Sequence, residues 1–341
     1  MKRLICCLVL LCFLLSSCAG QTQPEQKKYT ATFLTLFDTV TSIVGYADSE
    51  EEFQRITKPI HDELLIYHQL FDIYNDYDGV NNLKTVNDNA GIQPVLVDRK
   101  IIDLLLDCRQ YYETTNGCVN VAMGSVLKLW HVARNEGIND PANARLPKMD
   151  DLRNAAQYMD FSALIIDETA SSVYITDRNV SLDVGAIAKG WSLQRVVASA
   201  PDNLLISVGG NVCATGARDA QGTPWVVGVQ DPNGGDNYLH TLYVSGGSVV
   251  TSGDYQRAYI VDGEIYHHII DPDTLFPSTL WRSVTIVCND SGLADALSTA
   301  LFLLPREEGQ KLLDNFEARA MWVDREGNIF YSPGFETMIR T

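Results

Sequence analysis

The alternation of apolar and polar residues changes its period several times along the chain, which predicts a mixture of strands and helices. Period-two alternation over residues 29–46 predicts a pair of strands. Over residues 50–71 apolar side chains recur every three or four positions, which predicts an amphipathic helix that Pro59 should kink or interrupt. A second helix is expected over residues 98–114, capped by Asp98 and closed by Asn116-Gly117.

Residues 164–331 read mainly as short strands separated by Gly, Asn and Asp turns. Helices are expected within or near this region at 148–156, 186–200, 292–304 and 306–315, whereas residues 72–89 read as polar and turn-rich. Strands and helices do not alternate as βαβ units. The pattern therefore predicts an α+β fold, with antiparallel sheets, flanking helices and two intermeshed lobes, rather than a parallel doubly wound sheet.

Residues 251–277 combine a hairpin signal with chemically active side chains. Strands are expected at 255–261 and 265–270, joined by a turn at Asp262-Gly263. Because successive side chains of a strand point to opposite faces, His267 and His268 should point apart, and at most one should enter a given cleft unless the strand bulges. We expect His268 to share its face with Tyr266 and Ile270.

The N-terminus has the pattern of an export signal. A short basic start and an apolar run precede small residues and Cys18, which is typical of a bacterial lipoprotein cleavage site. We expect residues 1–17 to be a signal peptide, Cys18 to be lipidated, residues 18–29 to be a linker, and residues 30–341 to form the catalytic domain. An ordinary signal peptide or a short anchor helix is the alternative, although the apolar run is short for a membrane span.

Length and charge narrow the functional classes. A chain of 341 residues with 46% hydrophobic positions can bury a large core. The net charge of −17 falls to −19 when Lys2 and Arg3 leave with the signal, and this disfavours nucleic-acid binding. A phosphate ligand would then be held by a metal ion, helix N-termini and a few local cations.

Four cysteines remain after Cys18, namely Cys108, Cys118, Cys213 and Cys288, and no CxxC pair is present. The spacing disfavours a zinc site or a redox dithiol. We expect these side chains to be small buried apolar residues, with one disulfide bridge as the alternative.

Two segments combine a strand end with glycine and polar residues. In the first, Asp183 and Lys189 flank small residues where a strand runs into a helix, an arrangement that suits a ligand hydroxyl and a phosphate. A helix cap with a solvated lysine is the alternative. In the second, Gly209-Gly210 at a strand end marks either close approach of a ligand or a bulge.

Asp295 and Thr299 are four residues apart within an apolar helical segment and therefore share one face. A carboxylate and a hydroxyl, completed by a carbonyl, phosphate oxygens and water, suit a hard cation such as Mg²⁺. The alternative is an Asp near the positive end of the helix dipole and a Thr bonded back to its own helix.

The order and spacing of five segments closely resemble the FAD:protein FMN transferase (ApbE) family of exported bacterial lipoproteins. These segments are DVGAIAKG, SVGGNV, TSGDYQRAY, YHHIIDP and DALSTA. The resemblance spans residue 30 to the C-terminus and implies an ApbE-like, T-fold-like domain with FAD bound between its lobes. It also implies Mg²⁺-dependent transfer of FMN from FAD to a threonine or serine hydroxyl of a partner protein, with release of AMP. An FAD pyrophosphatase giving FMN and AMP, and a non-catalytic FAD-binding lipoprotein, are the alternatives.

Site residues follow from the same resemblance. It implies that His268 is the general base and that the Ala186 carbonyl, Asp295 and Thr299 hold Mg²⁺. The implied FAD contacts are Phe37, Tyr74, Cys118, Val119, Asn120, Asp183, Lys189, Gly209, Gly210 and Ile269. The chain departs from the family pattern at Asn120, where an Asp is usual, and at Leu275-Phe276-Pro277, which replaces a Thr-Gly-x-Pro turn.

The resemblance further implies an acceptor in another chain, since no acceptor motif of the kind that the family modifies is found in this sequence. The expected partner is a flavin-carrying subunit of an Rnf or sodium-pumping NADH:quinone oxidoreductase complex, or a related extracytosolic protein. A lipid on Cys18 would hold the enzyme at the extracytoplasmic face of the cell membrane.

Overall fold

The computed structural model describes residues 26–235 and 237–341, and the predicted signal peptide and Cys18 lie outside these residues. Its centre is a sheet of eight strands in the order β1-β2-β6-β7-β10-β13-β14-β15, with antiparallel pairing throughout. These strands are β1 (Lys27–Leu36), β2 (Thr39–Ala47), β6 (Leu204–Val208), β7 (Asn211–Ala214), β10 (Gly247–Gly253), β13 (Ser283–Cys288), β14 (Ala318–Val323) and β15 (Ile329–Tyr331). The antiparallel prediction is confirmed, with β1 beginning two residues before the predicted start at Tyr29.

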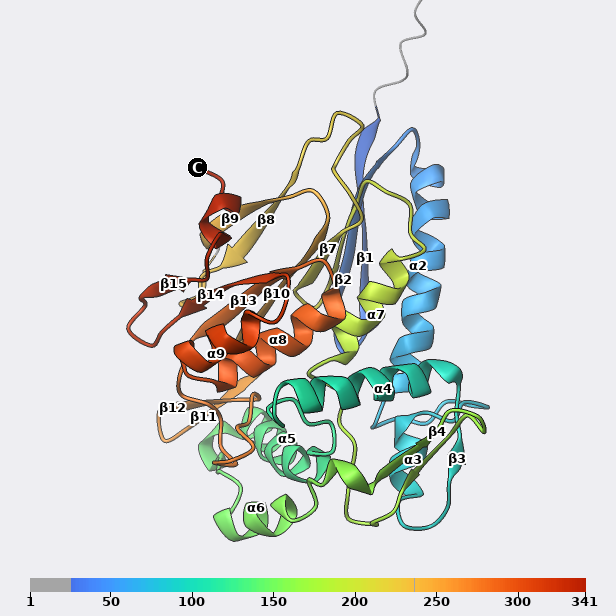
Figure 1. Ribbon diagram of the computed structural model, residues 1–341, viewed down its shortest axis with the longest axis vertical. Helices are drawn as coiled ribbons and strands as arrows, with labels where there is room; N and C mark the ends of the chain where they lie inside the picture. The colour runs from blue at the N-terminus through green and yellow to red at the C-terminus, as the bar shows by residue number, and fades with distance from the viewer. Residues whose placement is uncertain (1–25, 236) are drawn as a thin grey trace, which may run out of the picture.

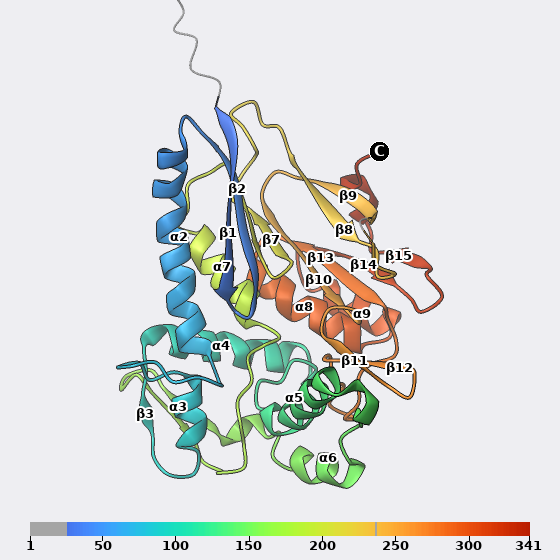
Figure 2. The same ribbon diagram turned by 180° about the vertical axis from the view of Figure 1, so that it is seen from behind.

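Helices cover one face of this sheet and a hairpin covers the other (Figures 1 and 2). The helical face carries α2 (Glu50–Phe71), α7 (Ala188–Val197), α8 (Ser291–Leu303) and α9 (Arg306–Leu313). The opposite face carries β8 (Trp225–Gln230) and β9 (Tyr238–Val244), whose buried side chains pack with those of β14 and Phe335. Each face of the sheet therefore contributes to a separate apolar core.

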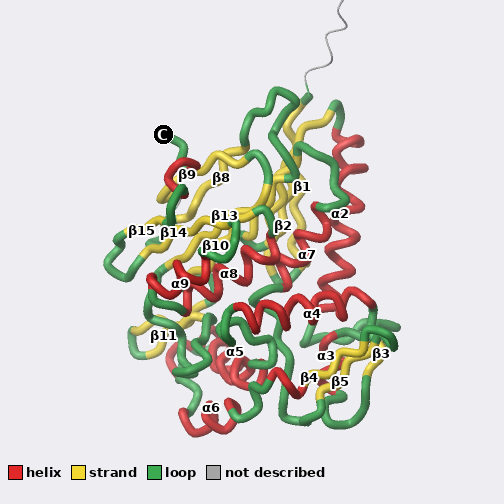
Figure 3. The backbone as a smooth tube through the Cα atoms, viewed as in Figure 1, coloured by secondary structure: helices red, strands yellow, loops and turns green. Residues whose placement is uncertain are grey.

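A second lobe is inserted in the chain between α2 and α7 (Figure 3). It contains a small sheet and four helices, namely β3 (Val95–Leu96), β4 (Leu164–Asp167), β5 (Ser172–Ile175), α3 (Leu83–Asp88), α4 (Arg99–Thr114), α5 (Gly124–Asn139) and α6 (Met149–Ala156). A hairpin from the first lobe, β11 (Ala258–Val261) and β12 (Glu264–His267), packs against α5. This exchange of contacts confirms two intermeshed lobes.

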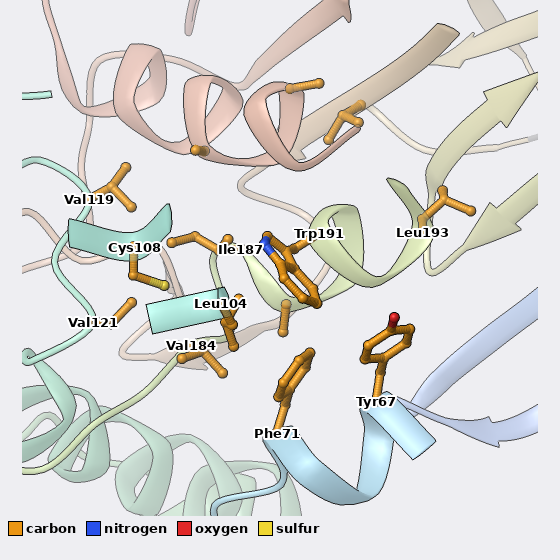
Figure 4. Close-up of a cluster of buried hydrophobic side chains, with 14 of the residues drawn as sticks. Tyr67, Phe71, Leu104, Cys108, Val119, Val121, Val184, Ile187, Trp191 and Leu193 are labelled. Atoms are coloured by element: carbon orange, nitrogen blue, oxygen red, sulfur yellow. The ribbon is translucent and has the colours of Figure 1, made fainter. Parts of the chain in front are cut away.

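The lobes share an aromatic core around Trp191 on α7 (Figure 4). Tyr67 and Phe71 of α2 lie edge-on to the Trp191 ring, with centroids 5.6 and 5.5 Å away. The indole N–H of Trp191 donates to Asp107 of α4 at 2.7 Å. Contacts of this kind hold α2, α4 and α7 together, and thereby set the position of one lobe relative to the other.

The predicted helix boundaries hold where a cap is readable in the sequence. Asp98 accepts a hydrogen bond from the amide of Lys100, and Asn116 and Gly117 adopt positive φ after α4 ends. The expected interruption at Pro59 is wrong, because α2 runs unbroken through it. Pro59 lies on the exposed side of the helix, where solvent can hydrate the carbonyl freed by its missing N–H.

Two helices were not predicted. The polar residues 72–89 contain α3, which Asn82 caps with a side-chain bond to the amide of Thr85. The helix α5 begins after Met123 without any side-chain cap, so its start carries no cap signal in the sequence. Because α5 forms a large part of the site described below, its omission is the main error in the predicted elements.

Cys108, Cys118, Cys213 and Cys288 are free thiols in the described part of the chain, and all except Cys118 are buried. The predicted role as small apolar residues is confirmed for those three. No helix within residues 26–235 and 237–341 has both the length and the apolar composition of a membrane span.

Candidate functional site

A cavity of about 540 Å³ is lined by residues of both lobes. Twelve of the predicted site residues line it, and they come from segments far apart in the sequence. They are Phe37, Tyr74, Cys118, Val119, Asn120, Asp183, Ala186, Lys189, His268, Ile269, Asp295 and Thr299. The fold therefore brings together, around one cavity, residues that the family resemblance identified from separate sequence motifs.

Gly209 and Gly210 do not line this cavity. They form the tight turn between β6 and β7 with φ of 57° and 91°, a backbone conformation that favours glycine. A Cβ on Gly209 would lie 2.7 Å from the Thr39 side chain, so this glycine also permits close packing. Asn211, the residue after the turn, does line the cavity, and its buried Nδ2 has no hydrogen-bond partner within the described residues.

Asp183 does not cap α7, because the N-cap position is Ile187 and has no side-chain bond. Its Oδ1 accepts from the amide of Gly185 at 2.9 Å, which fixes the turn before the helix. Burial raises the pKa of the Asp183 carboxyl, although that hydrogen bond acts in the opposite direction. Asp183 is thus an oriented carboxylate at the cavity wall.

Asp295 is a buried carboxylate in the second turn of α8. Its Oδ2 accepts from the amide of Gly190 at 2.8 Å and lies 3.7 Å from the ammonium of Lys189. The N-cap of this helix is Asp290, so Asp295 is not the residue that caps the helix start. Within the described residues the Thr299 hydroxyl makes no side-chain hydrogen bond, so the alternative of a bond back to the helix is not observed.

No group of three or more His, Cys, Asp or Glu side chains in residues 26–235 and 237–341 is arranged to hold a metal. The proposed donors at α8 differ in kind, since they are one carboxylate, one hydroxyl and the Ala186 carbonyl, and all three residues line the cavity. Hard oxygen donors fit Mg²⁺, which characteristically keeps water and substrate phosphates as its other ligands. The residues present therefore fit a magnesium ion held jointly by the protein and a phosphate.

The histidine pair differs from the predicted regular strand. Strand β12 ends at His267, so His268 lies beyond it, and the expected strand over 265–270 is too long because Ile270 makes only an isolated bridge to Pro277. His267 Nε2–H donates to the Ser278 carbonyl at 2.8 Å, and its Nδ1 accepts from the Ile269 amide at 3.2 Å. Both nitrogens of His267 are therefore used in backbone contacts.

His268 is different, because its buried Nδ1 has no partner among the described residues. Burial, and after it the positive charge of Arg257, lower the pKa of this imidazole to about 3. His268 is accordingly a neutral side chain that lines the cavity and has one buried nitrogen without a partner among the described residues.

Asn120 replaces the acidic residue expected from the resemblance, and its amide has two backbone partners. Its Nδ2 donates to the Met159 carbonyl at 2.9 Å, and its Oδ1 accepts from the Ala122 amide at 2.9 Å. A carboxylate lacks the donor that the first bond requires. The neutral side chain therefore fits this loop better than an aspartate.

The sequence reasoning missed two arginines and a histidine in the cavity wall. His131 and Arg134 on α5, and Arg257 before β11, all line the cavity. His131 Nδ1 lies 3.2 Å from the Tyr74 hydroxyl and 3.2 Å from the Arg134 guanidinium. The three-residue spacing of His131 and Arg134 was the available signal, and it was lost because α5 was not predicted.

Comparison with known proteins places this geometry in context. The model of the ApbE family matches residues 37–322. A Treponema pallidum protein named FAD:protein FMN transferase is 35% identical over 277 residues, which are 76% of this chain and 75% of that protein. A Klebsiella pneumoniae protein of the same name is 32% identical over 285 residues, covering 80% and 86% of the two chains.

Among solved structures, the crystal structure of the ApbE protein from Thermotoga maritima superposes with a TM-score of 0.81 at 29% identity. The match covers 92% of this chain and all of that one. The sequence match, the shared fold and the cavity residues agree, and the chain belongs to the ApbE family.

Proposed function

We propose that this protein is an FAD:protein FMN transferase. It transfers the FMN half of FAD to a threonine or serine hydroxyl of another protein, forms a phosphoester and releases AMP. The observation that carries the proposal is one cavity lined by His268, whose buried Nδ1 has no partner among the described residues, and by the oxygen-bearing side chains of Asp295 and Thr299. The names of the relatives from Treponema pallidum and Klebsiella pneumoniae support the same reaction.

His268 serves as the general base in this proposal. As the acceptor oxygen forms its bond to the FMN phosphorus, the hydroxyl proton passes to the neutral imidazole of His268. The bond between that phosphorus and the bridging oxygen breaks, and the oxygen leaves with AMP. Asp183 orients FAD, and Lys189 neutralises part of the phosphate charge at the start of α7.

An imidazole with a pKa of about 3 is a weak base near neutral pH, so the base must be activated. Arg257 and Lys189 both lower this pKa, and a bound diphosphate offsets their charges. This offset concerns only the contribution of the charges, since burial, the largest cause of the lowered pKa, persists when FAD occupies the cavity.

A magnesium ion bound by Asp295, Thr299 and the Ala186 carbonyl would neutralise charge that develops on the diphosphate. The Gly190 amide fixes one carboxylate oxygen of Asp295 by hydrogen bonding. Lys189 lies 3.7 Å from the same oxygen, so a cation already sits beside this carboxylate. Both contacts hold the carboxylate of Asp295 in a fixed orientation at the cavity.

We also propose that Cys18 carries a lipid and that the enzyme acts at the extracytoplasmic face of the cell membrane. The support is the sequence pattern around Cys18. The acceptor is then a protein on that side of the membrane. A flavin-carrying subunit of an Rnf or sodium-pumping NADH:quinone oxidoreductase complex, or a related electron-transfer protein, has the required location.

The test is to incubate the purified protein with FAD and Mg²⁺, with and without an acceptor subunit, and to follow FMN, AMP and the acceptor mass. We expect the acceptor to gain one FMN and AMP to appear in equal amount. Rapid release of FMN and AMP without acceptor would establish an FAD pyrophosphatase instead. Retention of unchanged FAD would establish a binding protein without turnover.

A further inference from the structure

The turn between β1 and β2 has an uncommon backbone conformation at the cavity wall. Leu36 pairs with Thr39 across this turn. Phe37 and Asp38 lie between them with φ of 53° and 51°, and both line the cavity. A two-residue turn of this kind favours asparagine and glycine, because a residue with a Cβ is strained at positive φ. The surrounding structure must therefore hold Phe37, a predicted FAD contact, in a conformation that its own backbone disfavours.

A histidine of α2 contacts this turn through both its ring and a hydrogen bond. The Phe37 amide donates to His68 Nδ1 at 3.2 Å, and the two rings lie edge to face with centroids 5.7 Å apart. Because an amide N–H can only donate, Nδ1 of His68 is the accepting nitrogen and the ring proton is on Nε2. His68 Nε2 lies 3.3 Å from the hydroxyl of Tyr77. The imidazole therefore accepts from the turn on one side and donates to Tyr77 on the other.

A carboxylate ends this chain of hydrogen bonds. The Tyr77 hydroxyl donates to Asp72 Oδ2 at 2.7 Å. Burial raises the pKa of the Tyr77 phenol to about 12, and the bond to Asp72 acts in the same direction, so the hydroxyl keeps its proton. Burial acts to raise the pKa of the Asp72 carboxyl, but hydrogen bonds from Asn75, Tyr74 and Tyr77 outweigh it and the pKa lies below its ordinary value. Asp72 is thus an ionised acceptor.

The same carboxylate fixes the backbone of the second predicted aromatic contact. Asp72 Oδ1 accepts from the amide of Tyr74 at 2.6 Å and from that of Asn75 at 3.1 Å, which sets the turn after α2. Tyr74 lines the cavity, and its hydroxyl lies 3.2 Å from His131 Nδ1. One carboxylate oxygen therefore orients the backbone of Tyr74. The other orients the backbone of Phe37 through the chain described above.

Tyr77 differs from the other members of this arrangement. Phe37, His68, Asp72 and Tyr74 line the cavity, whereas Tyr77 does not. It is partly buried, and its hydroxyl bonds to two of the lining side chains. Tyr77 can therefore influence a ligand only through its neighbours, which separates a positioning role from direct contact.

We propose that Tyr77 is a positioning residue for FAD. The Asp72 chain, which runs from Asp72 through Tyr77 and His68 to the Phe37 amide, holds the two aromatic contacts in place for a ring system of FAD. This inference rests on the proposed function and deepens the description of the same site. Aromatic side chains bind a planar ring in particular geometries, which are lost when either backbone moves. Since the ring systems of FAD are remote from the bond that breaks, these contacts contribute to affinity and not to the rate of the chemical step.

The first test is Tyr77→Phe in the full protein, which removes one hydroxyl and no part of the cavity wall. The Kd for FAD is measured by calorimetry without acceptor, and KM for FAD and kcat are measured by FMN transfer. Tyr77→Phe should raise Kd and KM about tenfold, the size of a lost hydrogen bond to a charged group, and should change kcat less than about twofold. Tyr67→Phe is the matched control, because its hydroxyl bonds to Glu63 within α2 and Tyr67 does not line the cavity. It should match the unmodified protein.

The second test examines the turn without any ligand. His68→Leu and His68→Asn both remove the imidazole and are similar in size, but only the asparagine offers an oxygen to the Phe37 amide. Hydrogen exchange of that amide, followed by NMR in the ligand-free protein, should be about tenfold faster in His68→Leu than in His68→Asn. The affinity for FAD should follow the same order. His61→Leu, on the same helix but outside the cavity, should leave both quantities unchanged.

An unchanged Kd for FAD in Tyr77→Phe would overturn the inference, and so would equal exchange of the Phe37 amide in the two His68 variants. A lower kcat at unchanged KM in Tyr77→Phe would also overturn it, because Tyr77 would then act on the chemical step. Failure of the unmodified protein to bind or split FAD would instead reject the proposed function. Amide exchange in the ligand-free protein would still decide whether His68 holds the turn, so the two failures are distinguishable.

Discussion

The amide of Gly190 donates a hydrogen bond of 2.8 Å to the carboxylate of Asp295, and this contact joins residues that are 105 positions apart. A Cβ at position 190 would lie 2.5 Å from Asp295 Cβ and would overlap the Ser291 carbonyl oxygen. Only glycine therefore lets α7 approach α8 closely enough to form this bond. Because Gly190 has no side chain, its amide can hold the carboxylate of Asp295, a proposed metal ligand, in place.

Gly190→Ala should lower the free energy of unfolding by about 1–3 kcal/mol, because the added methyl group overpacks the contact between α7 and α8. It should also weaken Mg²⁺-dependent activity by moving the Asp295 carboxylate. The measurement is urea unfolding together with transfer assays over a range of Mg²⁺ concentrations.

Gly309→Ala is the matched control. Gly309 lies within α9, and a Cβ there would lie 3.4 Å from the Leu301 side chain of α8, which is an ordinary contact distance. We expect it to leave stability unchanged or to raise it by up to about 1 kcal/mol. Equal stabilities of the Gly190→Ala and unmodified proteins would contradict the steric argument.

Asp295→Ala and Thr299→Ala should each abolish FMN transfer, and excess EDTA should do the same to the intact protein, because all three remove the proposed cation. Single-turnover transfer at saturating FAD is the measurement. Asp314→Ala, which removes an exposed carboxylate at the end of α9, serves as the control and should retain activity. Full activity in the presence of excess EDTA would contradict the assignment of Asp295 and Thr299 as metal ligands.

The two neighbouring histidines should differ in their effect on the reaction. His268→Asn should slow single-turnover transfer by a factor on the order of 10² or more, as expected for loss of a general base. His267→Asn should cost much less activity, because the bonds of His267 run to the Ser278 carbonyl and the Ile269 amide. FAD binding should survive both changes, and the reverse ranking of the two variants would show that the roles are exchanged.

His268 should also make the folded protein sensitive to acid. Its pKa is lowered from 6.5 to about 3 in the folded state, so below about pH 6.5 the unfolded chain takes up a proton that the folded protein does not. Stability should therefore be unaffected by this group above that pH and should fall progressively between about pH 6.5 and 3. Burial lowers the pKa of His267 as well, which acts in the same direction.

Urea unfolding at a series of pH values, compared between the unmodified protein and His268→Asn, isolates this contribution because the other titrating groups are common to both. The variant should lose less stability than the unmodified protein on acidification. Parallel pH profiles would show that His268 becomes protonated in the folded state without penalty.

Cys18→Ser should leave the protein without a lipid and release it from the membrane fraction, since Cys18 is the predicted site of lipidation. Cys12→Ser, within the apolar part of the predicted signal, is the control and should still be membrane-bound. Membranes are fractionated after washing in high salt and at alkaline pH. Continued association of the Cys18→Ser protein under these conditions would refute the anchor.

The sequence alone determined those features that depend on neighbours along the chain. The cap at Asp98, the positive φ at Asn116 and Gly117, and the two-residue turn at Asp262 and Gly263 all follow from local backbone preferences. Motif order carried the family resemblance, and most of the residues it singled out line one cavity.

Tertiary structure decided what depends on long-range packing. Helix α5 starts without a cap signal, and its position against the β11–β12 hairpin is what brings His131 and Arg134 to the cavity. At Gly209 and Gly210 the sequence allowed two interpretations, close approach of a ligand or a tight turn. The tertiary structure shows a tight turn packed against Thr39. The bond between Gly190 and Asp295 exists only once α7 and α8 are packed, since neither residue carries a local signal for the other.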